Sequence, residues 1–332
     1  MAVVAMISAE WNNLVEVTYS TNCSISSANK RTGNYGFCLN AGATSEMYRV
    51  FSPPPSEAYL QFGWRGDPSL ANNRTFFAFR SGTASLICIK RNASNLLEIR
   101  SGWDGALLAT GITPILNATW YVIELHFKLA DTGGVAELRV DGNLECAFYG
   151  DTKPGAETTF DQMYWYASSG GYGYVLDDVV LHDTAGSANN SWPGGVKLGL
   201  LKPTSDGAAR EWTPSYGSDH YTLVDEVPPS GTDYLRAAAN DLIDLFGLED
   251  LPAEAQSVKA VALDFFGLKG STVAPTRIAQ IANLSGTDYV QGDQDLPLAQ
   301  GLVRKILDTN PAGGNWSVAT VNAMLSGIKS RA

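Results

Sequence analysis

The residues between Trp120 and Phe148 alternate between apolar and polar side chains, and this alternation constrains the fold more than any other feature of the sequence. In residues 120–129, one face is apolar and consists of Tyr121, Ile123, Leu125, Phe127 and Leu129. The opposite face carries Glu124, His126 and Lys128. A period of two is typical of an antiparallel strand with one buried face, because successive side chains of a strand point to opposite sides.

Two more strands follow this segment and form a meander with it. Residues 135–140 alternate in the same way, and Asp141-Gly142 then provides a two-residue hairpin signal, because glycine tolerates the positive φ of a primed turn. Residues 144–148 place Leu144, Cys146 and Phe148 on one side. Other short apolar runs bounded by turn residues predict further strands at 36–39, 59–64, 75–79, 85–90, 96–100, 160–166 and 174–182. Many short strands at regular spacing indicate a β-sandwich.

Small and turn-forming residues dominate residues 186–195, which predicts a linker or a rim loop there. Beyond it, strands are expected at 241–248 and 258–266, and a single helix at 317–325, capped by Ser317 and ended by Gly327. The predicted fold is therefore all-β, with two antiparallel, jelly-roll-like sandwich modules and one short C-terminal helix. The first module spans residues 1–185 and the second, mainly β and expected to serve assembly or attachment, spans 196–332.

Charge and hydropathy exclude several classes of protein. The chain has 23 Lys and Arg against 34 Asp and Glu, a net charge of −11, and no basic arm or stripe, which disfavours a nucleic-acid partner. Apolar residues make up 45% of its 332 residues, enough for real cores. No apolar run approaches the ~20 residues of a membrane helix, so membrane insertion is not expected.

Four segments together carry a resemblance to a known fold family. Residues 31–39, 119–125, 135–142 and 176–181 resemble the laminin-G and concanavalin A-like jelly rolls, over roughly residues 1–185. The resemblance implies two stacked antiparallel sheets. Lectins, glycosidases and plain structural modules all use this fold, so it does not by itself choose among them.

The C-terminal half carries a second resemblance. The segments that carry it are residues 198–203, 212–216 and 224–226, the repeated Gly-Thr-Asp-Tyr at 231–234 and 286–289, residues 258–261 and the tail 311–323. Together these segments are similar to virion structural proteins of tailed bacteriophages. This resemblance implies a role in particle assembly, localisation in the virion after synthesis in the host cytoplasm, and other virion proteins as partners.

Motifs for enzymatic chemistry are missing from the sequence. The hydrolase elbow, phosphate-binding loops and the zinc-protease motif do not occur, and no strand offers two carboxylates at alternate positions, as concanavalin A-like glucanases do. Glu137, Asp141 and Glu145 lie four residues apart, with the hairpin turn between them. The Ser218-Asp219-His220 run cannot form a relay, because adjacent side chains diverge. The sequence thus predicts a protein that is not an enzyme and requires no cofactor.

Candidate ligand sites remain. Asp177 and Asp178 are adjacent and should point to opposite faces of a strand, where they either bind a structural Ca²⁺ with loop carbonyls or hydrogen-bond to loop backbone. Trp103, Tyr172 and Tyr174 lie in or beside glycine-rich turns and are candidates for stacking on a glycan. The alternative is that these aromatics plug the ends of the sandwich or contact a neighbouring subunit.

Assembly candidates lie in two strands of the second module that are apolar on both faces. They are Phe246, Leu248, Phe265 and Phe266. Such strands are buried on both sides, by another subunit of a homo-oligomer or within the module, where the C-terminal helix could cover one face.

The leading hypothesis is a non-enzymatic structural component of a tailed-phage particle, either a head decoration or a tail fibre or tip protein, that displays its jelly roll outward. The alternative is a carbohydrate-binding adhesin for host-surface glycans. A glycan hydrolase is a third reading, which the missing carboxylate pair disfavours.

Overall fold

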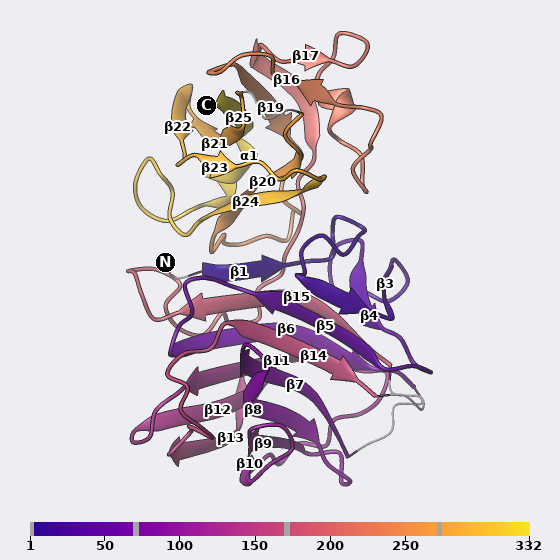
Figure 1. Cartoon of the computed structure of the whole chain (residues 1–332), viewed down its shortest axis with the longest axis vertical. Coiled ribbons are helices and arrows are strands. Elements are labelled where there is room, and N and C mark those ends of the chain that lie inside the picture. The colour runs from indigo at the N-terminus through magenta and orange to yellow at the C-terminus, as the bar shows by residue number, and fades with distance from the viewer. Residues whose placement is uncertain (1–2, 69–72, 169–172, 271–273) are drawn as a thin grey trace. The chain divides into compact units, whose positions relative to one another are not determined.

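The chain forms two compact units, Met1–Gly199 and Leu200–Ala332, and almost all of its regular structure is antiparallel β-sheet (Figure 1). The computed structural model describes residues 3–68, 73–168, 173–270 and 274–332. The all-β prediction is confirmed. None of the helices in these ranges is long and apolar enough to cross a membrane.

Two antiparallel sheets stack face to face in the first unit (Figure 1). The first sheet has the order β13 (Asn143–Gly150), β12 (Gly134–Val140), β11 (Trp120–Lys128), β6 (Glu57–Gly66), β15 (Tyr174–Asp183), β4 (Gly36–Leu39) and β3 (Cys23–Ser26), and β1 (Val3–Ile7) also pairs with β15. The second sheet has the order β10 (Leu107–Thr110), β9 (Leu97–Ser101), β8 (Ala84–Arg91), β7 (Arg74–Ser81), β14 (Gln162–Ala167), β5 (Ser45–Val50) and β2 (Tyr19–Thr21). This is the sandwich that the alternating strands predict.

Aromatic side chains fill the space between the two sheets. Phe62 of β6 contacts Phe77 of β7 and Trp165 of β14, with ring centroids 5.5 and 6.1 Å apart. Phe79 stacks on Phe127 of β11 at 5.9 Å. Burial of such large rings is the main stabilising contribution to a sandwich core.

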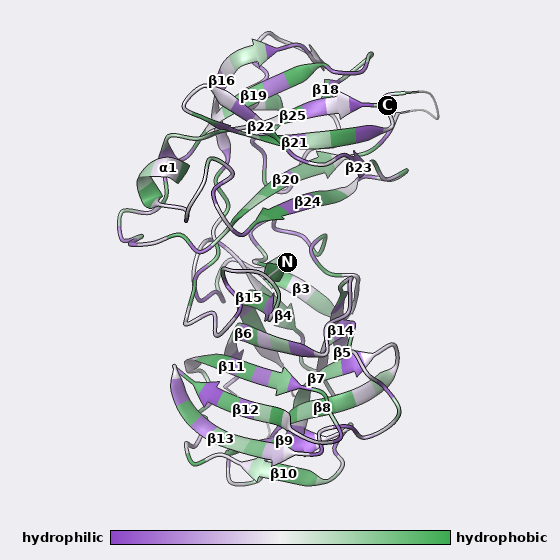
Figure 2. Cartoon of the chain, turned by 90° about the vertical axis from the view of Figure 1, so that its left-hand side faces the viewer, coloured by the Kyte–Doolittle hydropathy of each residue, from purple (hydrophilic) through white to green (hydrophobic). Residues whose placement is uncertain are grey.

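The meander predicted for residues 120–148 is present. Asp141 and Gly142 have φ values of 50° and 79°, as a primed two-residue turn requires, and Val140 pairs with Asn143 across it. Figure 2 shows apolar and polar residues in alternating bands along β11 and β12. Ile123, Leu125 and Phe127 are fully buried in the core, as expected.

Residues 186–199, which we call the strap, cover the outer face of the first sheet. Trp192 packs against Tyr59 and His126, with centroid distances of 5.3 and 6.0 Å. The N–H of Gly194 donates to Glu124 Oε1 at 2.9 Å. The outer face of β11 is thus covered in its middle, where Glu124 is only 2% exposed, while Lys128 near its end keeps 45% of its side chain exposed. Residues 186–195 belong to the first unit, and the division between the units follows Gly199.

The second unit is built on a sheet with the order β16 (Pro203–Arg210), β19 (Ile243–Leu248), β25 (Leu325–Arg331), β21 (Arg277–Leu284) and β22 (Thr287–Val290), and β23 (Gln294–Asp295) also pairs with β21. Two further strand pairs are β20 (Val261–Gly267) with β24 (Gly301–Leu307) and β17 (Thr213–Pro214) with β18 (Leu235–Arg236). A 3₁₀ turn, η1 (Tyr221–Leu223), and one helix, α1 (Val318–Asn322), complete the described elements.

The predicted C-terminal helix is correct at its start and wrong at its end. Ser317 caps α1 by accepting a hydrogen bond from the Thr320 N–H at 3.1 Å. Gly327 does not end the helix, because it lies in β25 between Leu245 and Ile281 of the neighbouring strands. The Leu245 side chain occupies the space where a Cβ at position 327 would lie, so this glycine serves close packing.

Three of the four assembly candidates pack against apolar clusters of the second unit. Phe246 is 7% exposed and belongs to an apolar cluster with Trp212, Ile278 and Ile328. Phe265 is half-buried against that cluster, and Leu248 is half-buried against a second cluster around Trp316. Phe266 is also half-buried. Phe246 is therefore buried within the unit, as the intrachain alternative requires, whereas a subunit contact through the half-buried Leu248, Phe265 and Phe266 stays a prediction.

Candidate functional site

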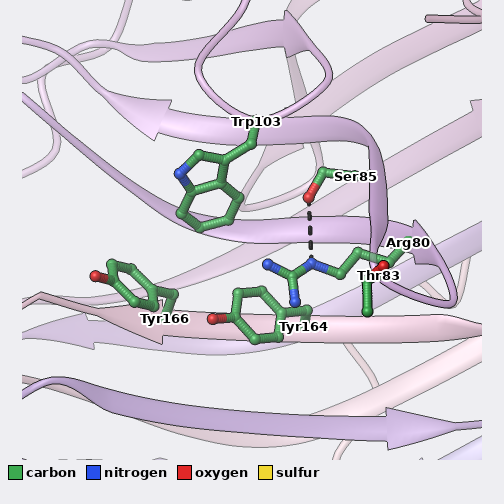
Figure 3. A pocket seen from close by; sticks show the side chains of 6 residues that line it. All are labelled: Arg80, Thr83, Ser85, Trp103, Tyr164 and Tyr166. Atoms are coloured by element: carbon green, nitrogen blue, oxygen red, sulfur yellow. Dashed lines mark hydrogen bonds between the residues drawn. The ribbon is translucent and has the colours of Figure 1, made fainter. Parts of the chain in front are cut away.

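The outer face of the second sheet carries a pocket formed by the strands β7, β8 and β14 and by two turns. β14 alternates strictly, so Met163 and Trp165 enter the core while Tyr164 and Tyr166 project outward. β7 contributes Arg80, and the turn between β9 and β10 contributes Trp103. The pocket, which we call the aromatic pocket, has a volume of about 380 Å³ and is lined by Arg80, Thr83, Ser85, Trp103, Tyr164 and Tyr166 (Figure 3).

Trp103 forms one wall and the two tyrosines form the floor. The indole meets Tyr166 at a centroid distance of 5.3 Å and an interplanar angle of 89°, and meets Tyr164 at 5.7 Å and 70°. Tyr164 and Tyr166 lie nearly parallel, 6.2 Å apart. Trp103 remains 38% exposed, so part of its ring is open to a ligand. An exposed aromatic surface in a polar recess is a binding-site geometry.

Arg80 is held flat against this floor. Its guanidinium carbon lies 3.2 Å from the centroid of the Tyr164 ring and 5.6 Å from that of Trp103. Nε donates to Ser85 Oγ at 3.2 Å, which fixes the plane of the guanidinium (Figure 3). Burial raises the pKa of Tyr164 above its usual range, although the Arg80 charge acts in the opposite direction. Tyr164 is therefore a neutral phenol at physiological pH.

The turn that presents Trp103 is anchored at several points. Gly102 and Asp104 both have positive φ, 63° and 55°. The Gly102 N–H donates to Leu86 O at 2.9 Å, and Lys90 Nζ donates to Asp104 Oδ1 at 2.8 Å. Arg100 Nη1 donates to Gly105 O at 2.8 Å. These contacts fix Trp103 before any ligand arrives, which reduces the entropy lost on binding.

Of the three aromatics predicted to contact a glycan, the structure places only Trp103 at this pocket. Tyr174 is 3% exposed, and its hydroxyl donates within the core to Phe76 O or Tyr166 O, at 2.9 and 3.1 Å, so its assignment is corrected. Tyr172 lies outside the described residues. Sequence reasoning missed Tyr164 and Tyr166, although the alternation of residues 162–167 predicts that they face away from the core.

The carboxylate oxygens of Asp177 and Asp178 accept hydrogen bonds from groups of the protein itself. Asp177 Oδ2 accepts from the N–H groups of Arg31 and Thr32 at 2.7 and 3.1 Å. Asp178 accepts from Arg31 Nη1 at 2.5 Å, from Thr32 Oγ1 at 2.7 Å and from the Leu198 N–H at 2.7 Å. Burial first, and then the charge of Asp178, raise the pKa of Asp177 to about 7, against the effect of its backbone donors.

These contacts match the alternative to a calcium site, in which the two carboxylates hydrogen-bond to loop residues, and the calcium site itself stays a prediction. The two side chains do not diverge as a regular strand requires, because Asp178 has a φ of 50° and the β15–β6 register shifts between Asp177 and Val180. Within the described ranges, His, Cys, Asp and Glu residues form no group of three placed to hold a metal ion.

His220 in the second unit contacts a carboxylate that the sequence did not indicate. Its Nδ1 lies 2.6 Å from Asp244 Oδ2, and both side chains are buried. Asp244 Oδ1 accepts from the N–H groups of Glu211 and Trp212 at 2.7 and 2.8 Å. Ser218 instead donates to the adjacent Asp219. The Asp244–His220 pair therefore ties β19 to the loops that flank it.

Comparison with known proteins finds structures of similar fold but no family. No family model and no curated protein matches the chain. A carbohydrate esterase from the Shiga toxin-encoding bacteriophage phi24B is 14% identical, with a TM-score of 0.41 over 54% of this chain and 97% of its own. The alginate lyase Aly36B is 12% identical, with a TM-score of 0.39 over 55% and 98%. The carbohydrate-binding module CBM66 from Bacillus subtilis is 12% identical, with a TM-score of 0.36 over 50% and 97%.

The prediction that the chain is not an enzyme is corrected by this comparison. The structures of similar fold include a carbohydrate esterase and an alginate lyase. A fold does not by itself decide between binding and catalysis.

Proposed function

We propose that the first unit binds carbohydrate at the aromatic pocket. The observation that carries this proposal is the arrangement of Trp103 across a floor of Tyr164 and Tyr166, with part of the indole open to solvent. A sugar ring has an apolar C–H face that stacks on an aromatic ring and hydroxyl groups that need polar partners. The pocket offers both, because Arg80, Ser85 and Thr83 line it beside the rings.

The rigidity of the pocket supports this proposal. Arg80 is oriented by Ser85 and Tyr164, and Trp103 is held by a turn bonded to β8. A shallow sugar site gains little from buried area, so an arrangement fixed in advance contributes much of the affinity.

Substitution of Trp103 tests the proposal. The purified protein, Trp103→Ala and the control Tyr149→Ala are compared on a glycan array, and hits are titrated by calorimetry. Tyr149 is a matched control, because it is a 67% exposed aromatic of the first sheet. Trp103→Ala should weaken binding at least tenfold, about 1.4 kcal/mol, while Tyr149→Ala binds like the parent. Equal binding by the parent and Trp103→Ala contradicts the proposal.

We further propose that the chain is a component of a tailed-phage particle, a head decoration or a tail fibre or tip protein, in which the first unit meets a host-surface glycan. The support is the resemblance of residues 198–323 to virion structural proteins. The partners would be further copies of this chain and other virion proteins. Antibodies raised against the purified protein should label gradient-purified particles from the phage that encodes it, and particles free of the chain contradict this part of the proposal.

A further inference from the structure

We propose that the carbohydrate bound at the aromatic pocket is acidic, and that Arg80 binds the carboxylate of a uronic acid or similar sugar. This inference rests on the proposed carbohydrate-binding function and adds the chemical class of the ligand.

Arg80 is a cation without a carboxylate partner. Its Nε donates to the neutral Ser85 hydroxyl, and its plane lies on Tyr164. Among the residues that the structure describes, no carboxylate lies within ion-pair distance of this guanidinium. An arginine that is already desolvated on one face, with its charge uncompensated, attracts an anionic ligand.

The neighbouring cations are already neutralised. Lys90 pairs with Asp104 at 2.8 Å, and Arg100 pairs with Glu98 at 2.7 Å. Asp161, next to β14, accepts from the Gly82 N–H at 2.9 Å. Glu46 of β5 lies near Tyr164, where burial is the main cause of the raised pKa of the phenol and the Glu46 charge adds to it. Arg80 is thus the pocket cation left for a ligand.

The geometry of Arg80 suits a carboxylate. Because Nε is engaged by Ser85, the two terminal nitrogens Nη1 and Nη2 remain for a ligand. These nitrogens present parallel N–H groups that match the two oxygens of a carboxylate. Trp103, with its centroid 5.6 Å from the guanidinium carbon, is close enough to stack on the ring that carries this carboxylate. Figure 3 shows the guanidinium extending toward the space between Trp103 and Tyr164.

The experiment compares each acidic oligosaccharide with its own carboxyl-reduced form. The probes are tetrasaccharides of galacturonic, glucuronic and mannuronic acid, and in the reduced forms a CH₂OH group replaces each carboxylate. Affinities are measured by calorimetry for the full-length protein, Arg80→Gln, Arg80→Lys and Trp103→Ala. Melting temperatures and circular dichroism spectra identify any variant that fails to fold.

The parent protein should bind at least one acidic probe tenfold or more tightly than its reduced form. Arg80→Gln should bring this ratio below about threefold, whatever its effect on the affinity for the reduced form. Arg80→Lys keeps the positive charge but loses the two parallel N–H groups of the guanidinium, so it should give an intermediate ratio. The ratio should also fall as salt is raised from about 20 mM to 500 mM, because the contact is between charges.

The outcomes separate the two proposals. If neutral sugars bind through Trp103 and no acidic probe is preferred, the carbohydrate-binding function stands and the acidic ligand is wrong. The acidic ligand is also wrong if Arg80→Gln folds and keeps the full preference. If the parent binds none of the probes and no glycan of an array, both proposals are wrong.

Discussion

Asp178 Oδ1, in the middle of β15, accepts a hydrogen bond of 2.7 Å from the N–H of Leu198 near the end of the strap. The same carboxylate pairs with Arg31, whose side chain is 16% exposed. One fully buried acid therefore fastens two loops that are far apart in the sequence to the outer face of the first sheet.

Removal of the Asp178 side chain should destabilise the first unit strongly. Asp178→Ala is expected to lower the free energy of unfolding by about 3–5 kcal/mol, because it leaves the Arg31 charge buried without its partner. Asp178→Asn keeps an oxygen for the Leu198 N–H and should cost less. Urea denaturation measures both. The exposed ion-pair variant Asp131→Ala serves as the control and should stay within about 1 kcal/mol of the parent. Equal stability of Asp178→Ala and the control contradicts the role assigned to this acid.

The neighbouring Asp177 should make stability depend on pH. Its pKa is raised from 3.8 to about 7 on folding, so the folded chain holds this proton more tightly than the unfolded chain. The resulting stabilisation is complete below about pH 4 and is lost as the pH rises through about 7. The parent is therefore expected to lose stability relative to Asp177→Asn as the pH rises. The difference between their free energies of unfolding, parent minus variant, should decrease from pH 4.5 to pH 8. The same difference for Asp131→Asn should change little, and a difference that rises for Asp177→Asn contradicts the raised pKa.

The strap should be required for a stable first unit. Val196 and Gln61 exchange two hydrogen bonds of 2.8 and 3.0 Å, and Arg139 lies 3.9 Å over the Trp192 ring. A chain that ends at Gly199 should fold, whereas one that ends at Ala185 loses these contacts and exposes the β6–β11 face. We expect a lower melting temperature for the shorter chain and faster hydrogen exchange in β6 and β11. Equal melting temperatures for the two chains are the result that rules this out.

Local sequence signals predict the strands and turns whose determinants lie within a few residues. The alternation of residues 120–129 and the Asp141-Gly142 turn are of this kind. The strap has no periodicity, and its contacts, such as Trp192 with Tyr59, join residues more than 100 positions apart. Its glycine- and asparagine-rich composition therefore predicts a linker or a rim loop but not the strands that it contacts. The prediction for Gly327 is wrong for a similar reason, because the role of this glycine depends on the position of Leu245.

The candidate site is predictable in part. Trp103 stands in a glycine-rich turn, which is a local signal. Arg80 is placed beside Ser85 and Tyr164 by a register shift in the β7–β8 pairing between Phe79 and Arg80, and nothing in the sequence marks that shift. The positive φ of Asp178 likewise breaks the rule that adjacent strand residues face opposite sides.

Lys90 should affect glycan binding without touching the ligand. It holds the Trp103 turn through Asp104, and the Lys90 side chain is 11% exposed. Lys90→Met keeps the apolar stem and removes the charged contact, so the turn becomes more mobile and affinity for the best array ligand should fall several-fold. Lys153→Met, which removes a similar lysine–aspartate pair at Asp131, is the matched control and should bind like the parent. Unchanged affinity in Lys90→Met means that Asp104 does not position Trp103.

Asp244 and His220 should together determine the local stability of the second unit. Asp244 lies in β19 with its side chain fully buried, and its two oxygens serve three donors: the N–H groups of Glu211 and Trp212 and the His220 ring. Asp244→Ala leaves both backbone groups unsatisfied, and each buried unpaired group costs about 1–3 kcal/mol. Asp244→Asn retains an oxygen for the two N–H groups, and the amide can donate to His220 Nδ1 in its other tautomer.

The expected order of stability is therefore parent, then Asp244→Asn, then Asp244→Ala. Hydrogen exchange followed by mass spectrometry reports on peptides from 203–224 and 241–248, which should exchange fastest in Asp244→Ala. Asp219→Ala is the control, since Asp219 is exposed and its described side-chain contact is with Ser218 alone. If Asp244→Ala exchanged no faster than Asp219→Ala, the buried pair would contribute nothing to the second unit, and the two N–H groups would have to find other acceptors.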